Sequence, residues 1–300
     1  MRTVNRSTQP PVVVGVDGSD HSLRALDRAV EEAVLRGAPL EVLCGAPAHR
    51  IAVSEGAADG AGEEHRRALR RQSRLIAESA AERARESAPG LEVEPAATDE
   101  TAVTALLRAG RRAALTVVGT RGHGGFTGLL LGSVSLRTAA RIEGPLMVVR
   151  GDNERPRHTV VVGVEHPADT GAARYGFEEA ERRAAALLVL HAWELPVYPG
   201  VMVPPPTRVL EEIAEEQARY EESVPLEAVT GLREAHPNVD ARVETVYAGP
   251  GHALVEASAS ADLVVLAAHR RHRRFGAHLG PVTHAVLHHA HCPVVLVPTA

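Results

Sequence analysis

Residues 114–135 read ALTVVGTRGHGGFTGLLLGSVS, an apolar run followed by a glycine-rich segment and then by Gly132-Ser133-Val134-Ser135. The apolar run is typical of a buried β-strand. Glycine lets backbone N–H groups approach an anion closely, and the N–H groups at the start of a helix complement negative charge. This stretch therefore predicts a strand, a phosphate-binding loop and a helix, in that order.

The spacing of the glycines separates this loop from two better-known phosphate loops. Two residues lie between Gly119 and Gly122, and nine lie between Gly122 and Gly132-Ser133. No lysine precedes the serine, as a Walker A loop requires, and the glycines do not have the tight spacing of the dinucleotide fingerprint. The pattern favours a nucleotide held mainly by backbone and hydroxyl groups, and an ordinary flexible connection is the alternative.

The chain repeats once. Val12-Val13-Val14-Gly15-Val16 returns at residues 160–164, and Pro145 with the strand after it returns as Pro293 and residues 294–297. Each half thus begins and ends with the same apolar strand. We expect two domains, 1–150 and 158–300, joined by the polar linker 151–157.

Strand and helix patterns alternate within each half, which predicts an α/β fold of parallel strands joined by right-handed crossovers. We expect ten strands, at residues 12–16, 40–44, 91–95, 115–119, 146–150, 159–164, 187–191, 241–247, 262–267 and 294–297. Ligands on such sheets bind beyond the carboxyl ends of the strands. Gly119 lies at one such end, and Asp17 directly follows the first strand.

Composition narrows the class of protein. Hydrophobic residues make up 44% of the 300 residues but aromatic ones only 3%, so the core consists of Val, Leu and Ala, which suits a covered parallel sheet. The net charge of -5 gives no reason to expect a nucleic-acid partner. Two cysteines, Cys44 and Cys292, exclude a disulfide framework. No apolar run approaches the roughly 20 residues that span a bilayer. We expect a soluble, cytoplasmic protein with no membrane contact.

Two segments together carry a family resemblance: the end of the first strand, Val14-Gly15-Val16-Asp17-Gly18-Ser19, and the loop from Gly119 to Ser135. With them the chain resembles a tandem universal stress protein over nearly its whole length. The resemblance implies two Rossmann-like (adenine nucleotide alpha hydrolase-like) domains. Each would be a five-stranded parallel sheet of order 3-2-1-4-5 with helices on both faces. It also implies ATP as the ligand, with or without Mg²⁺.

The resemblance assigns roles to individual positions of the first half. Asp17 and Gly45 would lie by the adenosine, although Gly45 replaces a residue that is usually larger and apolar. Gly119 and Gly122 would flank the ribose and phosphates. The phosphate tail would be held by Gly132, Ser133, Val134 and Ser135. Capping of a helix is the alternative role for Asp17 and for the two serines.

The second half departs from this pattern. Asp17 corresponds to Glu165, Gly119 to Ala267, Gly122 to Arg270 and Ser133 to Pro281. Proline removes an N–H donor, and arginine adds a side chain where backbone should meet phosphate. We expect this half to bind ATP poorly or not at all, and the alternative is that Arg270, Arg271, Arg273 and Arg274 bind a different anion.

Other candidate binding and metal-ligating residues have weaker support in the sequence. Arg121 and His123 either contact phosphates or are solvated loop charges. His284 and His288 have a metal-ligand spacing, but no complete ligand set accompanies them, so we expect no metal site. The arginine-rich stretch 270–274 is expected to be a solvated loop, and Cys44 a small buried residue.

The favoured function is a regulatory one: ATP binding in the first domain during stress or growth arrest. We expect no enzymatic activity beyond slow ATP hydrolysis or autophosphorylation on Ser133 or Ser135. The alternatives are a nucleotide-independent scaffold and an adenylate-forming enzyme with the Pro196–Pro206 loop as its lid. By resemblance, the edge strands Leu146–Val149 and Val294–Val297 pair with each other, and two chains form a homodimer. The downstream partner is not identified.

Overall fold

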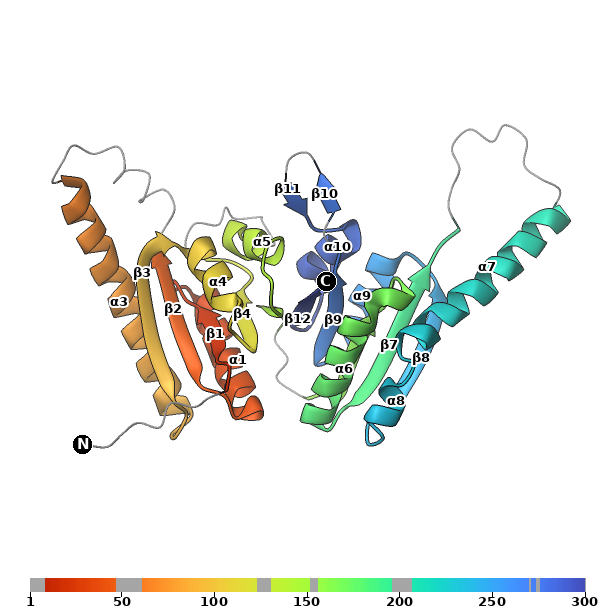
Figure 1. The fold of residues 1–300 in the computed structure, drawn as a ribbon, viewed down its shortest axis with the longest axis horizontal. Coiled ribbons are helices and arrows are strands. Elements are labelled where there is room, and N and C mark those ends of the chain that lie inside the picture. The colour runs from red at the N-terminus through yellow and green to blue at the C-terminus, as the bar shows by residue number, and fades with distance from the viewer. Residues whose placement is uncertain are drawn as a thin grey trace. The chain divides into compact units, whose positions relative to one another are not determined.

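The computed structural model describes residues 9–46, 61–122, 131–151, 156–195, 207–269, 271–273 and 276–299 (Figure 1). The chain divides into two compact units. The first comprises Met1–Arg150 with Arg270–Leu279, and the second comprises Gly151–His269 with Gly280–Ala300. We call the residues up to Arg150 the first domain and the second unit the second domain.

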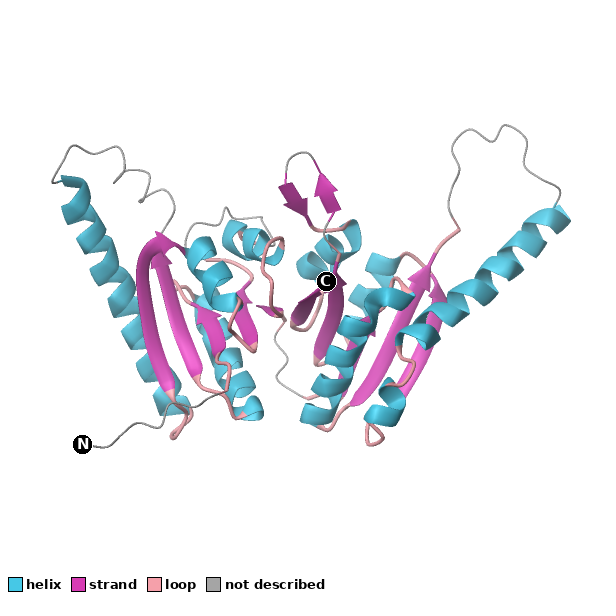
Figure 2. Cartoon of the chain, in the orientation of Figure 1, coloured by secondary structure: helices cyan, strands magenta, loops and turns pink. Residues whose placement is uncertain are grey.

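The first domain is built on five parallel strands in the order β3-β2-β1-β4-β5, shown in magenta in Figure 2. The strands are β1 (Val12–Gly15), β2 (Leu40–Ala46), β3 (Val93–Thr101), β4 (Leu115–Gly119) and β5 (Leu146–Val149). This confirms the predicted order 3-2-1-4-5. The switch point of the sheet, where ligands bind in such folds, lies between the carboxyl ends of β1 and β4.

Four helices of the described ranges cover this sheet. Helices α1 (Asp20–Arg36) and α3 (Ala61–Ser87) contact each other and pack on one face. Helices α4 (Ala102–Gly110) and α5 (Ser133–Ala139) contact each other on the other face. Ser19 caps α1, and its hydroxyl accepts a hydrogen bond from the Ser22 N–H.

The second domain repeats the architecture, with the strand order β12-β9-β6-β7-β8. Its strands are β6 (Thr159–Gly163), β7 (Ala186–Trp193), β8 (Ala241–Tyr247), β9 (Leu263–Ala268) and β12 (Val294–Pro298). Its helices are the 3-10 turn η1 (Pro167–Asp169), α6 (Thr170–Arg183), α7 (Thr207–Ala228), α8 (Leu232–Ala235), α9 (Pro250–Ser258) and α10 (Pro281–His289). The repeat seen in the sequence is therefore a repeat of fold.

The valine runs that reveal the repeat form the centre of each sheet. Val12, Val13 and Val14 in β1 are fully buried, and so are residues 160–162 in β6. A strand of a parallel sheet is covered by helices on both faces, so it needs apolar residues at consecutive positions. Cys44 is buried as expected, and burial raises the pKa of its thiol to about 11.

In two segments the structure differs from what the sequence leads us to expect. The strand predicted at 91–95 is β3, which runs on to Thr101. It is an edge strand with mostly half-exposed side chains, so its sequence lacks the apolar signal of the central strands. The stretch 270–274, expected to be a loop, contains the strand β10 (Arg271–Arg273). It pairs antiparallel with β11 (Gly276–His278), so that each strand satisfies backbone groups of the other.

A feature that the sequence analysis missed is a buried glutamate held by two arginines in the first helix of each domain. Glu32 of α1 is 1% exposed and forms ion pairs with Arg28, at 2.9 Å, and with Arg36. In α6 the fully buried Glu179 is paired with Arg182 and Arg183, three and four residues further along the helix. The helical spacing of three and four residues brings each arginine onto the face of the glutamate.

Some of the predicted features lie outside the described residues, namely the proposed lid 196–206 and His123. Within the described ranges, every helix is too short or too polar to cross a lipid bilayer.

Candidate functional site

The turn between β1 and α1 fixes the carboxylate of Asp17. Its Oδ1 accepts hydrogen bonds from the backbone N–H of Ser19, at 3.0 Å, and from the Ser19 hydroxyl, at 2.6 Å. The turn passes through Gly18, whose φ of 85° favours glycine. The other carboxylate oxygen, Oδ2, lies against Gly122, where a Cβ atom would overlap it. Asp17 therefore stabilises the turn with one oxygen and faces the glycine loop with the other.

Gly119 allows the end of β4 to approach the first turn of α1. A Cβ atom at this position would lie 2.5 Å from the carbonyl oxygen of His21. Together with Gly122 it leaves bare backbone at the carboxyl edge between β1 and β4. Bare backbone is what the close approach of a phosphate or ribose requires.

The start of α5 is tied to the same strand end. The N–H of Gly132 donates to the carbonyl of Thr120 at 2.6 Å. The hydroxyl of the buried Ser135 donates to the carbonyl of Gly119, also at 2.6 Å. That proton is not available to a phosphate oxygen, so Ser135 holds the loop in place. Ser133 and Val134 are exposed at the start of the helix, where a ligand can reach them.

The structure gives Gly45 a role in packing. A Cβ atom there would lie 2.6 Å from the Cα atom of Ala102, the first residue of α4. A larger residue would push α4 away from β2. This close approach accounts for the glycine at a position where the resemblance leads us to expect a larger apolar residue.

Basic side chains gather at the same edge. Nδ1 of His21 lies 2.6 Å from a guanidinium nitrogen of Arg24 and 3.2 Å from the Thr120 hydroxyl. Burial, then the positive charges of Arg24 and Arg121, lower the pKa of His21. Burial and Arg121 together lower the pKa of Arg150, which directly follows β5. Positive charge therefore accumulates beside Asp17.

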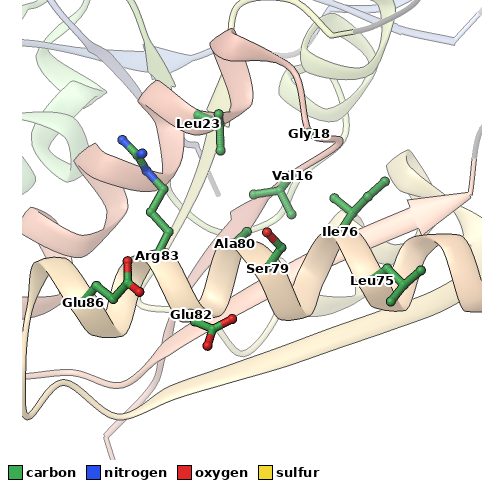
Figure 3. A pocket seen from close by; sticks show the side chains of 10 residues that line it. All are labelled: Val16, Gly18, Leu23, Leu75, Ile76, Ser79, Ala80, Glu82, Arg83 and Glu86. Atoms are coloured by element: carbon green, nitrogen blue, oxygen red, sulfur yellow. The ribbon is translucent and has the colours of Figure 1, made fainter.

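A hollow of about 630 Å³ adjoins the Asp17 turn, between α1 and α3 (Figure 3). Val16 and Gly18, the neighbours of Asp17, line it together with Leu23 of α1 and Ala80 of α3. Charged groups of α3 border it, and among them Arg83 is held by Asp27 of α1 through two hydrogen bonds of 2.9 and 3.1 Å. The hollow has the volume that ligand pockets commonly have.

The corresponding edge of the second domain is filled by the chain itself. The carboxylate of Asp169, 1% exposed, accepts hydrogen bonds from the backbone N–H groups of Glu165, at 2.8 Å, and His166, at 3.0 Å. Its other oxygen lies 3.0 Å from Nε2 of His269, which follows β9. An internal carboxylate therefore occupies the N–H groups at the end of β6.

Comparison with known proteins shows the family to which the chain belongs. The sequence profile described as the universal stress protein family matches residues 10–150 and again residues 156–298. The chain belongs to the universal stress protein family.

Relatives of this universal stress protein extend over its full length. One from Mycolicibacterium smegmatis is 30% identical over 308 residues, covering 98% of this chain and 99% of that protein. One from Mycobacterium tuberculosis is 31% identical over 313 residues, covering 97% and 96%. The crystal structure of a universal stress protein from Archaeoglobus fulgidus has a TM-score of 0.67. It covers 98% of this chain and all of that one at 15% identity, and it shows the same fold.

The structure of this universal stress protein brings six of the eight predicted site residues to one edge: Asp17, Gly119, Gly122, Gly132, Ser133 and Ser135. Val134 lies beside them in α5, and Gly45 packs against α4. Sequence reasoning missed His21, Arg24 and Arg150. Arg150 could have been found, because the predicted order places the end of the last strand beside the end of β4.

The second domain offers a test of the buried carboxylate of Asp169. Burial alone would raise the pKa of Asp169, but His269 and the N–H groups of His166 and Glu165 outweigh it and lower the pKa below 3.8. A lowered pKa means that the carboxylate stabilises the fold fully above about pH 4, and that this stability is lost as the pH falls further. We expect Asp169→Asn to lower the free energy of unfolding by about 1–3 kcal/mol at pH 7.

Urea unfolding of both proteins at pH 7, 5 and 3 measures this. The difference in free energy of unfolding between wild type and Asp169→Asn should be the same at pH 7 and 5. It should narrow at pH 3, because the wild-type carboxylate begins to take up a proton there, whereas asparagine has no group to protonate. Asp240→Asn is the matched control, since the Asp240 side chain is 67% exposed and should change stability little. A difference between wild type and Asp169→Asn that does not vary with pH would contradict the assignment.

Proposed function

We propose that this universal stress protein binds ATP in its first domain and acts as a regulator during stress or growth arrest. The observation that carries the proposal is the bare backbone at Gly119 and Gly122, set opposite the fixed carboxylate of Asp17. Backbone N–H groups and the Ser133 hydroxyl can donate to phosphates, whereas a carboxylate can accept from ribose or adenine.

A further feature supports a nucleotide. The guanidinium groups of Arg24, Arg121 and Arg150 at this edge complement the charge of phosphates. Mg²⁺ would bind together with ATP, as an ion coordinated by the phosphates. The carboxylate that the protein offers here, Asp17, already accepts two hydrogen bonds through Oδ1, so it fits an outer contact to the ion.

We propose that the second domain binds no ATP, so that one chain takes one nucleotide. Asp169 already accepts from the N–H groups at the end of β6, and Pro281 removes a donor at the start of α10. A bound triphosphate adds several negative charges to one edge of the first domain. Such a local change of charge is a common way to alter affinity for a protein partner. The predicted homodimer belongs to this proposal.

The first experiment is to denature freshly purified protein, identify any released nucleotide by mass, and titrate the nucleotide-free protein with ATP by calorimetry. About one ATP per chain supports the proposal. An absence of both released nucleotide and binding heat contradicts it and leaves a nucleotide-independent scaffold.

The role of Asp17 is tested by Asp17→Ala. We expect ATP affinity to fall about tenfold or more, because a hydrogen bond to a charged group contributes about 1.5–3 kcal/mol. Circular dichroism and thermal melting should show a folded protein. Asp20→Ala, three residues away and exposed, is the control and should bind ATP as the wild type does. If Asp17→Ala unfolds the first domain, the carboxylate is structural and the ligand role is wrong.

A further inference from the structure

Two arginines leave neighbouring strands of the first domain at the same edge. β4 and β5 pair in parallel with Gly119 opposite Val149, so Arg150 emerges beside Thr120 and Arg121. The Cα atom of Arg121 lies 3.4 Å from the position that a Cβ on Gly132 would take. Arg121 is thus fixed between the end of β4 and the residue that precedes α5, inside the proposed nucleotide site.

Arg121 is not a solvated loop charge. Its Nε is buried and has no hydrogen-bond partner among the described residues. A buried donor without an acceptor is destabilising, so the structure retains a group that an acceptor would satisfy. The acceptor that fits a guanidinium best is a planar or tetrahedral oxyanion bound through two oxygens.

The electrostatic setting of Arg150 differs from that of arginines elsewhere in the domain. Asp99 raises the pKa of Arg70 and Asp27 raises that of Arg83, as carboxylate partners do. Arg150 shows the opposite direction, because burial and the neighbouring charge of Arg121 disfavour its charged form. Two like charges held close together are stabilised when an anion binds between them.

At the corresponding edge of the second domain, a carboxylate of the chain itself supplies the anion. His269 takes the position that corresponds to Arg121, and the carboxylate of Asp169 lies 3.0 Å from it. In the first domain the position that corresponds to Asp169 is His21, a base. The first domain therefore has no carboxylate at the position that Asp169 holds in the second, so the acceptor for the buried Nε of Arg121 is left to a ligand.

We infer that Arg121 and Arg150 bind the phosphates beyond the first one, so that the site selects nucleoside di- and triphosphates over monophosphates and cyclic monophosphates. This rests on the proposed function, because it concerns the same site. Gly119 and Gly122 contact the nucleoside and first phosphate that these nucleotides share. Arg121 and Arg150 contact only the phosphates that a longer chain adds.

The test compares ATP, ADP, AMP and cyclic AMP by calorimetry on the full chain at one ionic strength. We expect the wild type to bind ATP at least about tenfold more tightly than AMP or cyclic AMP. Arg121→Gln and Arg150→Gln should each weaken ATP about tenfold and change AMP less than about twofold, because one charged contact to the outer phosphates is lost. Arg74→Gln, in an exposed pair on α3, is the control and should change neither.

The outcomes separate the two proposals. Equal affinity of the wild type for ATP and AMP would overturn the inference and leave the nucleotide site intact. Equal weakening of ATP and AMP in the arginine variants would also overturn it. Failure of every nucleotide to bind the wild type would overturn the proposed function itself. If a variant does not fold, the wild-type ratio of ATP to AMP affinity and its decrease with added salt decide the matter, since only an electrostatic contact is screened.

Discussion

Nucleotide binding should be lost when Gly122 is replaced by glutamate. The new Cβ would overlap Oδ2 of Asp17, so the Asp17 carboxylate or the loop after β4 must shift from the position it holds. The new carboxylate would also stand beside Asp17 and repel phosphates. Each effect costs at least one factor of ten in affinity, so we expect ATP binding to weaken by about a hundredfold or more.

Calorimetric titration of the Gly122→Glu variant with ATP measures this loss, and thermal melting checks that the first domain remains folded. Gly171→Glu is the matched control: it adds the same charge on α6, where a Cβ atom meets no other atom within 4 Å. The control should bind one ATP per chain. An affinity of Gly122→Glu equal to that of the control would place the nucleotide elsewhere.

The largest change in stability is expected at Glu32. Its carboxylate is 1% exposed and is paired with Arg28 and Arg36, and the Arg36 side chain is itself 7% exposed. Removal of the carboxylate leaves buried positive charge without its partner. We therefore expect Glu32→Ala to lower the free energy of unfolding by about 3–5 kcal/mol.

Glu31→Ala provides a control one residue away. Glu31 contacts the same Arg28 at 3.2 Å, but its side chain is 67% exposed, so its loss should cost less than about 1 kcal/mol. Urea unfolding of both variants, followed by circular dichroism, gives the comparison. Similar losses in the two variants would mean that burial does not make the Glu32 pair strong.

The parts of the fold that the sequence predicted are those that local pattern determines. Consecutive valines indicate β1 and β6, the alternation of strands with helices predicts parallel sheets, and the family resemblance implies the strand order 3-2-1-4-5. The glycine spacing also located the edge where Asp17 meets Gly122. These features depend on steric rules that act within a few residues or on the general rules of parallel sheets.

The rest depends on side chains that meet only after folding. Nothing in the sequence shows that the Ser135 hydroxyl is used by the Gly119 carbonyl, or that Gly45 makes room for α4. The pairing of Asp169 with His269 joins residues a hundred positions apart, so no local pattern indicates it. The strand predicted at 91–95 ends before β3 does, because most side chains of β3 are partly exposed and its apolar pattern is weak.

The carboxylate of Asp169 can also be regarded as a ligand tethered to its own receptor. It is joined by only a few residues to the N–H groups of Glu165 and His166 that it occupies. A short tether gives an effective concentration of about millimolar or higher, and the tethered group loses no translational freedom on binding. A free anion must therefore compete with this carboxylate for the same N–H groups. Under the proposed function, this single side chain distinguishes the copy of the duplicated domain that takes a nucleotide from the copy that does not.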